Sequence, residues 1–170
     1  FRRGQGEVAM LKLSNVTKRF GALVAVNNLS FTVEKGQVFG IAGPNGAGKS
    51  TVYNLITGFY DFEGSILFKG KEIAGQKPYQ IARQGIARTF QIPQTFPSLT
   101  VEQGLDVGNR FGNRKKYHIR RIEKIIDFVG LQDERKELTG TLNLLGKKKL
   151  MIGAALATEP EILMLDEPMA

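Results

Sequence analysis

Residues 43–50 read Gly-Pro-Asn-Gly-Ala-Gly-Lys-Ser, and this stretch decides the fold. It matches the pattern G-x-x-x-x-G-K-[ST], whose glycines let consecutive backbone N–H groups converge on phosphate oxygens. In such a loop Lys49 reaches the β- and γ-phosphates, and the hydroxyl of Ser50 ligates Mg²⁺. An apolar run precedes the loop and a helical pattern follows it. The stretch therefore predicts a P-loop site for a nucleoside triphosphate.

A second group of polar residues lies far downstream, where the apolar run Ile162–Leu165 leads into Asp166 and Glu167. A buried parallel strand delivers its last residues to the carboxyl edge of the sheet, where open α/β sheets bind ligands. We expect Asp166 to hold Mg²⁺ through water and Glu167 to polarise the attacking water. A capped strand end is the ordinary alternative, but a P-loop requires a strand of this kind.

Short elements punctuated by glycines surround the phosphate loop. Alternating apolar positions predict strands, and an apolar run between glycines predicts a buried parallel strand. A 3.6-residue spacing predicts a helix that ends at glycine. The expected elements are strands at Leu11–Val16 and Leu29–Val33, a buried strand at Gln37–Ala42, a helix at Lys49–Phe59 that buries Val52, Leu55 and Ile56, and a strand pair at Gly64–Ile73.

The C-terminal half reads differently, because helical patterns dominate it. The expected elements are a helix at Pro78–Gln84, a strand at Ile86–Phe90, a helix at Tyr117–Gly130 with a stripe of isoleucines, a helix at Lys147–Thr158 and the strand Ile162–Leu165. This order predicts an α/β P-loop fold with an N-terminal antiparallel β subdomain and an inserted helical subdomain. The expected division is a tag or upstream remnant at 1–9, the β subdomain and P-loop core at 10–96, the helical subdomain at 97–150, and the last helix and strand at 151–170.

Composition excludes several classes of protein. The chain has 170 residues, enough for one domain with a sizeable core. It has no cysteine and one histidine, His118, which excludes disulfide scaffolds, thiol nucleophiles and paired-histidine metal sites. No apolar run approaches the roughly 20 residues that span a bilayer. The remaining class is a globular domain of a reducing compartment with a basic surface.

Several motifs together resemble the ATP-binding subunits of ABC transporters. They are GPNGAGKST at 43–51, ILMLDEP at 162–168 and the aromatic residue in TKRFGALVAV at 17–26. The run GIARTFQIPQTFPSLTVEQ at 85–103 is similar to the subunits of branched-chain amino acid importers. A lipopolysaccharide-export ATPase is close, but that family usually lacks the Arg-Thr-Phe-Gln run of residues 88–91. A soluble P-loop module associated with nucleic acid is the rival from another class.

The resemblance implies roles for individual residues. Phe20 matches the aromatic residue that stacks on adenine, although an ordinary core phenylalanine is the alternative. Gln91 matches the glutamine that touches Mg²⁺ and senses the γ-phosphate. The implied site comprises catalytic Glu167, Gln91 and Lys49, the metal ligands Ser50, Gln91 and Asp166, and the ATP- or ADP-binding residues Phe20, Val26, Gly43, Pro44, Asn45, Gly46, Ala47, Gly48, Lys49, Ser50 and Thr51.

The resemblance also implies partners and a location. Residues 91–101 correspond to the surface that receives the transmembrane permease subunit, although Phe96 and Leu99 are equally compatible with the core of the helical subdomain. A second ATPase subunit completes the family's working unit, at the cytoplasmic face of the cell membrane. The basic residues between Arg110 and Leu150 are read first as a solvated face, then as a lipid-facing surface, and last as a nucleic-acid site, because no nucleic-acid motif accompanies them.

Two departures from the family pattern lower the expected rate of turnover. The signature Leu-Ser-Gly-Gly-Gln aligns with residues 143–147, where only Gly146 matches and Leu144 replaces the serine. We expect the amides of Leu145 and Gly146 and the helix N-terminus to remain available to phosphate. The chain also ends before the family's D-loop and switch histidine, which His118 cannot replace. A fragment or a natural truncation that binds nucleotide and hydrolyses it poorly is expected.

Overall fold

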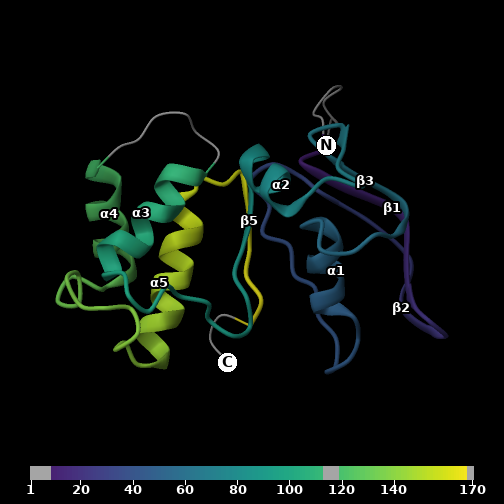
Figure 1. Cartoon of the computed structure of the whole chain (residues 1–170). Coiled ribbons are helices and arrows are strands. Elements are labelled where there is room, and N and C mark those ends of the chain that lie inside the picture. The colour runs from purple at the N-terminus through teal and green to yellow at the C-terminus, as the bar shows by residue number, and fades with distance from the viewer. Residues whose placement is uncertain (1–8, 113–118, 168–170) are drawn as a thin grey trace. The chain divides into compact units, whose positions relative to one another are not determined.

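The computed structural model describes residues 9–112 and 119–167, which belong to two compact units (Figure 1). One unit ends at Pro78 and the other begins at Tyr79. The first contains an antiparallel sheet and a helix, and the second contains parallel strands and a group of helices. The α/β class with an antiparallel β subdomain is therefore confirmed. Residues 1–8, 113–118 and 168–170, which include Tyr117 and His118, lie outside the described residues.

The first unit is built on a four-stranded antiparallel sheet with the order β2-β1-β3-β4. Its buried face carries alternating apolar residues of β1 and β3, as the period of two requires. The predicted strands are confirmed, and the first two extend further than expected, to Phe20 and from Leu23. The bounds are β1 Leu11–Phe20, β2 Leu23–Val33, β3 Glu63–Phe68 and β4 Lys71–Glu72.

The ladder between β1 and β2 shifts register at three places, and the first of them, between Leu13 and Val16, is a bulge that contains Asn15. Asn15 and Asn28 both have positive φ angles, of 52° and 49°, and the Nδ2 of Asn15 donates to the Oδ1 of Asn28 at 2.8 Å. Gly64 lies on β3 beside this bulge, where an added Cβ would sit 2.6 Å from the carbonyl oxygen of Asn15. Only glycine fits there, because its φ of 106° and the close backbone both exclude a side chain.

Helix α1, Lys49–Ile56, follows the phosphate loop and buries the three residues that its period predicted, Val52, Leu55 and Ile56. The preceding strand expected at Gln37–Ala42 is wrong. None of the strand pairs within the described ranges includes it, and Val38 is 99% exposed. An apolar run becomes a buried parallel strand only when neighbours hydrogen-bond it. Here the segment is held by a side chain instead, since the ring of Phe39 stacks on Phe31 at 4.8 Å between centroids.

The second unit contains two parallel strands whose carboxyl ends carry the polar residues of interest. Strand β5, Ile86–Arg88, pairs with β6, Ile162–Met164, and Arg88 lies opposite Met164. Both strands are shorter than the sequence predicted, and α2, Pro78–Gln84, precedes them with the predicted bounds. The parallel register places the residues after Arg88 and after Met164 at the same edge.

Three helices form the other part of the second unit and share one apolar core (Figure 1). They are α3 Val101–Phe111, α4 Ile119–Val129 and α5 Leu144–Ala157. Helix α3 was not predicted, although a capping box marks its start. The hydroxyl oxygen of Thr100 accepts from the amide of Gln103 at 3.2 Å, and the side chain of Gln103 accepts from the amide of Thr100 at 2.9 Å. Thr100 and Gln103 were therefore the sequence signal that could have predicted the start of α3.

Glycines allow α3 to approach α5 closely. An added Cβ on Gly108 would lie 2.4 Å from the carbonyl oxygen of Ala154, and one on Gly112 would lie 2.4 Å from the Cα of Thr158. Gly108 lies in α3, and Gly112 is the residue that follows its last turn. These contacts hold the end of α3 close to the C-terminal part of α5.

The observed boundaries refine the predicted ones. Helix α5 begins at Leu144 rather than Lys147, because Asn143 caps it, and it continues across the expected division at 150/151. The finer division at 96/97 and 150/151 stays a prediction. In the ranges that the structure describes, no helix has the length and apolar character needed to cross a membrane.

Candidate functional site

The phosphate loop has the backbone that its glycines predict. Gly46 and Gly48 adopt φ angles of 82° and 84°, in the left-handed region that favours glycine. Gly48 is the N-cap of α1 and has no side chain to bond the first helical N–H groups. Its Cα also lies close to β2, since an added Cβ would be 2.4 Å from the carbonyl oxygen of Ala25 and 3.7 Å from the Cγ2 of Val26. The loop thus directs the start of a helix outward while packing against β2.

Lys49 folds back over this loop. Its Nζ donates to the carbonyl oxygens of Gly43 at 2.7 Å and Pro44 at 2.9 Å. The ammonium group is thereby held above the loop that supplies the N–H groups. The remaining predicted loop residues are mostly exposed, as phosphate binding requires; they are Asn45, Gly46, Ala47 and Ser50, with Thr51 half-buried.

Phe20 ends strand β1 and is not a core residue, because 42% of it is exposed. Its ring meets Tyr60 edge to face, with centroids 5.2 Å apart and planes at 83°. The Nζ of Lys18 lies 5.1 Å from the Phe20 centroid and forms an ion pair with Asp61 at 2.6 Å. Neither Tyr60 nor Lys18 was predicted as part of the site. Tyr60 is far from Phe20 along the chain, and a single lysine such as Lys18 is too common to indicate a role. These two side chains hold the partly exposed ring in place.

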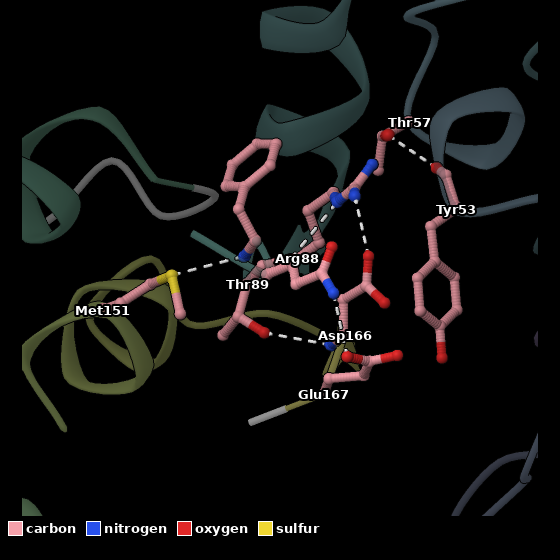
Figure 2. Close-up of polar contacts among 9 residues, drawn as sticks. Tyr53, Thr57, Arg88, Thr89, Met151, Asp166 and Glu167 are labelled. Carbon is pink, nitrogen blue, oxygen red and sulfur yellow. Dashed lines mark hydrogen bonds and ion pairs between the residues drawn. The ribbon is translucent and has the colours of Figure 1, made fainter. Parts of the chain in front are cut away.

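The edge of the parallel strands in the second unit brings Asp166 together with β5 (Figure 2). The backbone N–H of Asp166 donates to the hydroxyl of Thr89 at 3.1 Å, and the amide of Thr89 donates to the carbonyl of Met164 at 2.9 Å. The Nη2 of Arg88 lies 3.4 Å from the Oδ2 of Asp166. Sequence reasoning did not pair Arg88 with Asp166, because 78 positions separate them.

Gln91 and Glu167 also meet at this edge. The Nε2 of Gln91 donates to the Oε2 of Glu167 at 2.9 Å. Glu167 has a φ of 47°, a strained backbone for a residue other than glycine. Of the predicted catalytic residues, these two are therefore in direct contact, and Asp166 is the neighbour of one of them. The catalytic role predicted for Glu167 stays a prediction.

The N-terminus of α5 differs from the sequence expectation. The amide of Gly146 donates to the Oδ1 of Asn143 at 2.8 Å, so it is not available to phosphate as predicted. Asparagine is a strong N-cap, and here it satisfies one of the helix's own first donors. Leu144 and Leu145 project outward and are 62% and 56% exposed. The expectation for the amide of Gly146 is therefore wrong.

The segment expected to receive a permease lies on the surface of the second unit. Phe96 is 56% exposed, which argues against a place in the core, whereas Leu99 is half-buried. Thr139 holds the segment in place, since its hydroxyl donates to the carbonyl of Phe96 at 2.7 Å and its amide to that of Leu99 at 2.8 Å. The segment is thus an anchored loop with an exposed aromatic residue.

The donors predicted for Mg²⁺ fit the chemistry of that ion. Hydroxyl, amide and carboxylate oxygens, as in Ser50, Gln91 and Asp166, are its preferred ligands. Residues 9–112 and 119–167 contain no group of three or more His, Cys, Asp or Glu side chains that would hold a metal ion by themselves.

A glycine-capped phosphate loop and an acidic strand end on a parallel pair define a P-loop nucleotide-binding protein. Known proteins narrow this class. The ABC transporter family matches residues 26–170. The branched-chain amino acid transport ATP-binding protein BraF of Pseudomonas aeruginosa is 38% identical over 95% of this chain and 70% of its own length. A probable protein of that kind, LivG of Methanocaldococcus jannaschii, is 34% identical over 95% and 68%.

A solved structure agrees with these sequence relatives. The ADP conformation of an ATP-binding cassette of an ABC transporter superposes with a TM-score of 0.81 at 34% identity, over 95% of this chain and 70% of that one. This chain belongs to the ABC transporter family, as an ATP-binding subunit of the type represented by BraF and LivG.

Proposed function

We propose that this chain binds MgATP and couples its hydrolysis to the import of branched-chain amino acids. The observation that carries the proposal is the phosphate loop, in which Gly48 caps α1 without a side chain and Lys49 lies over the loop. Helix N-termini of this kind bind anions because their N–H groups and dipole point at the ligand. The amino acid substrate is proposed from the similarity to BraF and LivG, which are branched-chain amino acid transport ATP-binding proteins.

The proposed roles divide between binding and chemistry. The adenine ring stacks on Phe20 beside Val26, and the phosphates lie on residues 43–51 with the Lys49 ammonium on the β/γ pair. Ser50, Gln91 and Asp166 provide the oxygen donors for Mg²⁺, and Glu167 polarises the attacking water. Phosphoryl transfer needs positioning and charge stabilisation more than covalent chemistry, so these groups suffice for binding and for a basal reaction.

We propose slow turnover for this chain on the basis of α5. Leu144 has no hydroxyl to offer a γ-phosphate, and Asn143 already uses the amide of Gly146. Loss of one preorganised donor to a transition state costs about 10²–10³ in rate. Binding of ATP depends on the other helix, α1, and does not suffer from this loss.

The proposed partners are a transmembrane permease pair and a second ATPase subunit. The permease docks on residues 91–101, whose exposed Phe96 offers an apolar contact, at the cytoplasmic face of the membrane. The helical region is expected to make no specific nucleic-acid contact. A dimeric arrangement is known for another ATP-binding cassette, which was solved with ADP and phosphate bound.

Two measurements test the proposal. Titration calorimetry with MgATP measures binding, and phosphate release measures hydrolysis, with Glu167→Gln as the variant that keeps binding and loses the reaction. Leucine uptake by Pseudomonas aeruginosa lacking BraF, with this chain or its Lys49→Ala variant supplied, tests the transport role. Absence of ATP binding contradicts the whole proposal. ATP binding without restored uptake contradicts the assignment to branched-chain amino acid import.

A further inference from the structure

The carboxylate of Asp166 is paired with a cation supplied by the protein. Arg88 ends β5, and its Nη2 lies 3.4 Å from the Oδ2 of Asp166, just beyond the end of β6 (Figure 2). The two side chains are only 7% and 6% exposed. A carboxylate buried this deeply is costly unless a positive charge or hydrogen bonds compensate it. Arg88 provides that charge in the second unit itself.

Other contacts fix both members of the pair. The Nε of Arg88 donates to the carbonyl of Thr89 at 3.3 Å, and the guanidinium lies 4.6 Å from the centre of the Phe90 ring. The amide of Phe90 in turn donates to the sulfur of Met151 on α5 at 3.2 Å. On the other side, the hydroxyl of Thr89 holds the backbone of Asp166. The ion pair is therefore built into the strand edge and is not a chance surface contact.

We propose that Arg88 is the resident counter-ion of Asp166 and competes with a divalent cation for this carboxylate. Asp166 then binds a metal ion well only when phosphate oxygens of a nucleotide supply further negative ligands. The inference rests on the proposed function, because the cation in question is the one that accompanies ATP. Arg88 is a positioning residue in this account, since it acts through Asp166 and not on the substrate.

The physical reason is the balance of charge around one carboxylate. A divalent cation beside Asp166 gains attraction from the carboxylate and meets repulsion from a guanidinium a few ångströms away. Phosphate oxygens restore the net negative charge that the guanidinium removes. Arginine suits the position better than lysine, because its planar fork reaches the carbonyl of Thr89 and the carboxylate of Asp166 at once. A lysine keeps the charge but not this fixed geometry.

Binding of Mn²⁺ alone, followed by the electron paramagnetic resonance of free Mn²⁺, tests the proposal on the full chain. Wild type should bind Mn²⁺ weakly, and Arg88→Gln should bind it about tenfold more tightly, because one repelling charge is removed. The gain should vanish in the double variant Arg88→Gln/Asp166→Asn. Circular dichroism establishes that each variant is folded. A folded Arg88→Gln chain that binds Mn²⁺ no better than wild type overturns the proposal.

Arg88→Lys covers the case in which Arg88→Gln fails to fold with its buried carboxylate unpaired. Because the lysine ammonium loses the contacts to Thr89 and Phe90, Mn²⁺ affinity should rise about threefold, between the other two chains. Affinity at or below that of wild type overturns the proposal. ATP titration is measured separately on wild type. A chain that binds no ATP contradicts the proposed function, while the Mn²⁺ series still decides the role of Arg88.

Discussion

Helices α1 and α5 both begin at a position that the family uses for phosphate, yet their N-termini are built differently. At α1 the cap is Gly48, in a left-handed conformation and without a side chain. At α5 the cap is Asn143, whose side chain accepts from the amide of Gly146. The two caps thus differ in backbone conformation and in side chain: Gly48 makes no side-chain bond to the first N–H groups of α1, whereas Asn143 satisfies one of those of α5. The cap residue, more than the helix, decides which of these occurs.

The largest effect is expected from a substitution at the N-terminus of α1. Lys49→Ala should weaken MgATP binding roughly 10- to 150-fold, because a charge-assisted hydrogen bond contributes about 1.5–3 kcal/mol. Lys147→Ala, which removes a lysine from the first turn of α5, is the matched control and should leave the affinity unchanged. Titration calorimetry measures both. Equal ATP affinity for wild type and Lys49→Ala contradicts the role assigned to this loop.

A second substitution separates base recognition from phosphate recognition at the first of the two sites. Phe20→Ala should weaken ATP and ADP together by about 1–3 kcal/mol, the range for stacking on an aromatic side chain. Phe20→Tyr should be nearly silent, and inorganic phosphate binding should not change. Phe128→Ala removes another exposed ring, from α4, and serves as the control. If Phe20→Ala unfolds the chain without a selective defect in binding, the ring is structural.

A smaller effect is expected at the cap of α5. Asn143→Ala should lower the free energy of unfolding by about 1 kcal/mol, the usual cost of losing an N-cap. ATP affinity should stay the same, because the loop before α1 is untouched. Urea denaturation with calorimetry on the same samples checks both statements. A loss of ATP affinity in this variant would show that the N-termini of α1 and α5 are coupled.

The smallest effect is expected in the pH dependence of stability, to which one carboxylate in each unit contributes. In the first unit, burial raises the pKa of Glu72, but hydrogen bonds from the Ser65 hydroxyl and the amides of Ala74, Ile66 and Ile73 outweigh it and leave the pKa lowered. A carboxyl whose pKa is lowered in the folded state stabilises the fold at pH values above its unfolded pKa of about 4.3. That stabilisation is lost as the pH falls through the folded pKa. Glu72→Gln should therefore flatten the stability profile in that acidic window, as thermal melting at stepped pH would measure.

Glu102 provides the counterpart in the second unit. The hydrogen bond from Arg135 lowers the pKa of Glu102, with Nη2 at 2.5 Å and Nε at 3.1 Å from its two oxygens. Glu72 accepts hydrogen bonds from four groups, whereas those to Glu102 come from the Arg135 side chain alone, in a pair that water screens. Glu102→Gln should therefore change the acid limb less. A larger change for Glu102→Gln would reverse the ranking of the two units.

Much of the fold followed from the order of residues along the chain. The apolar period predicted the three buried residues of α1, because a helix is a local pattern of 3.6 residues. Pro78, which suits a first helical turn, predicted the bounds of α2. The strand predicted at Gln37–Ala42 is wrong. A strand needs a neighbouring strand that hydrogen-bonds it, and the apolar composition of the segment does not show whether such a neighbour exists. Helix α3 was missed although its capping box is local, because Thr100 was read as part of the docking segment 91–101 and Gln103 only as the end of the family-like run at 85–103.

The candidate site also has one part that the sequence predicted and another that depends on the folded chain. The phosphate loop was readable because eight consecutive residues carry it, and its positive φ angles agree with the glycines that the pattern demands. The exposure of Phe20, its contact with Tyr60 and the capture of the Gly146 amide by Asn143 depend on the folded chain. A sequence pattern identifies a donor, but only the structure tells which acceptor has already taken it.

The sequence by itself therefore determined the class of this protein, since a contiguous phosphate loop and an acidic strand end are enough for a P-loop nucleotide site. The tertiary structure decided which side chains those groups contact. It placed Arg88 beside Asp166 and Gln91 beside Glu167, across 78 and 76 positions of the chain. The physical reason is that a local motif is written in adjacent residues, whereas the pairing of parallel strand ends depends on which strands become neighbours.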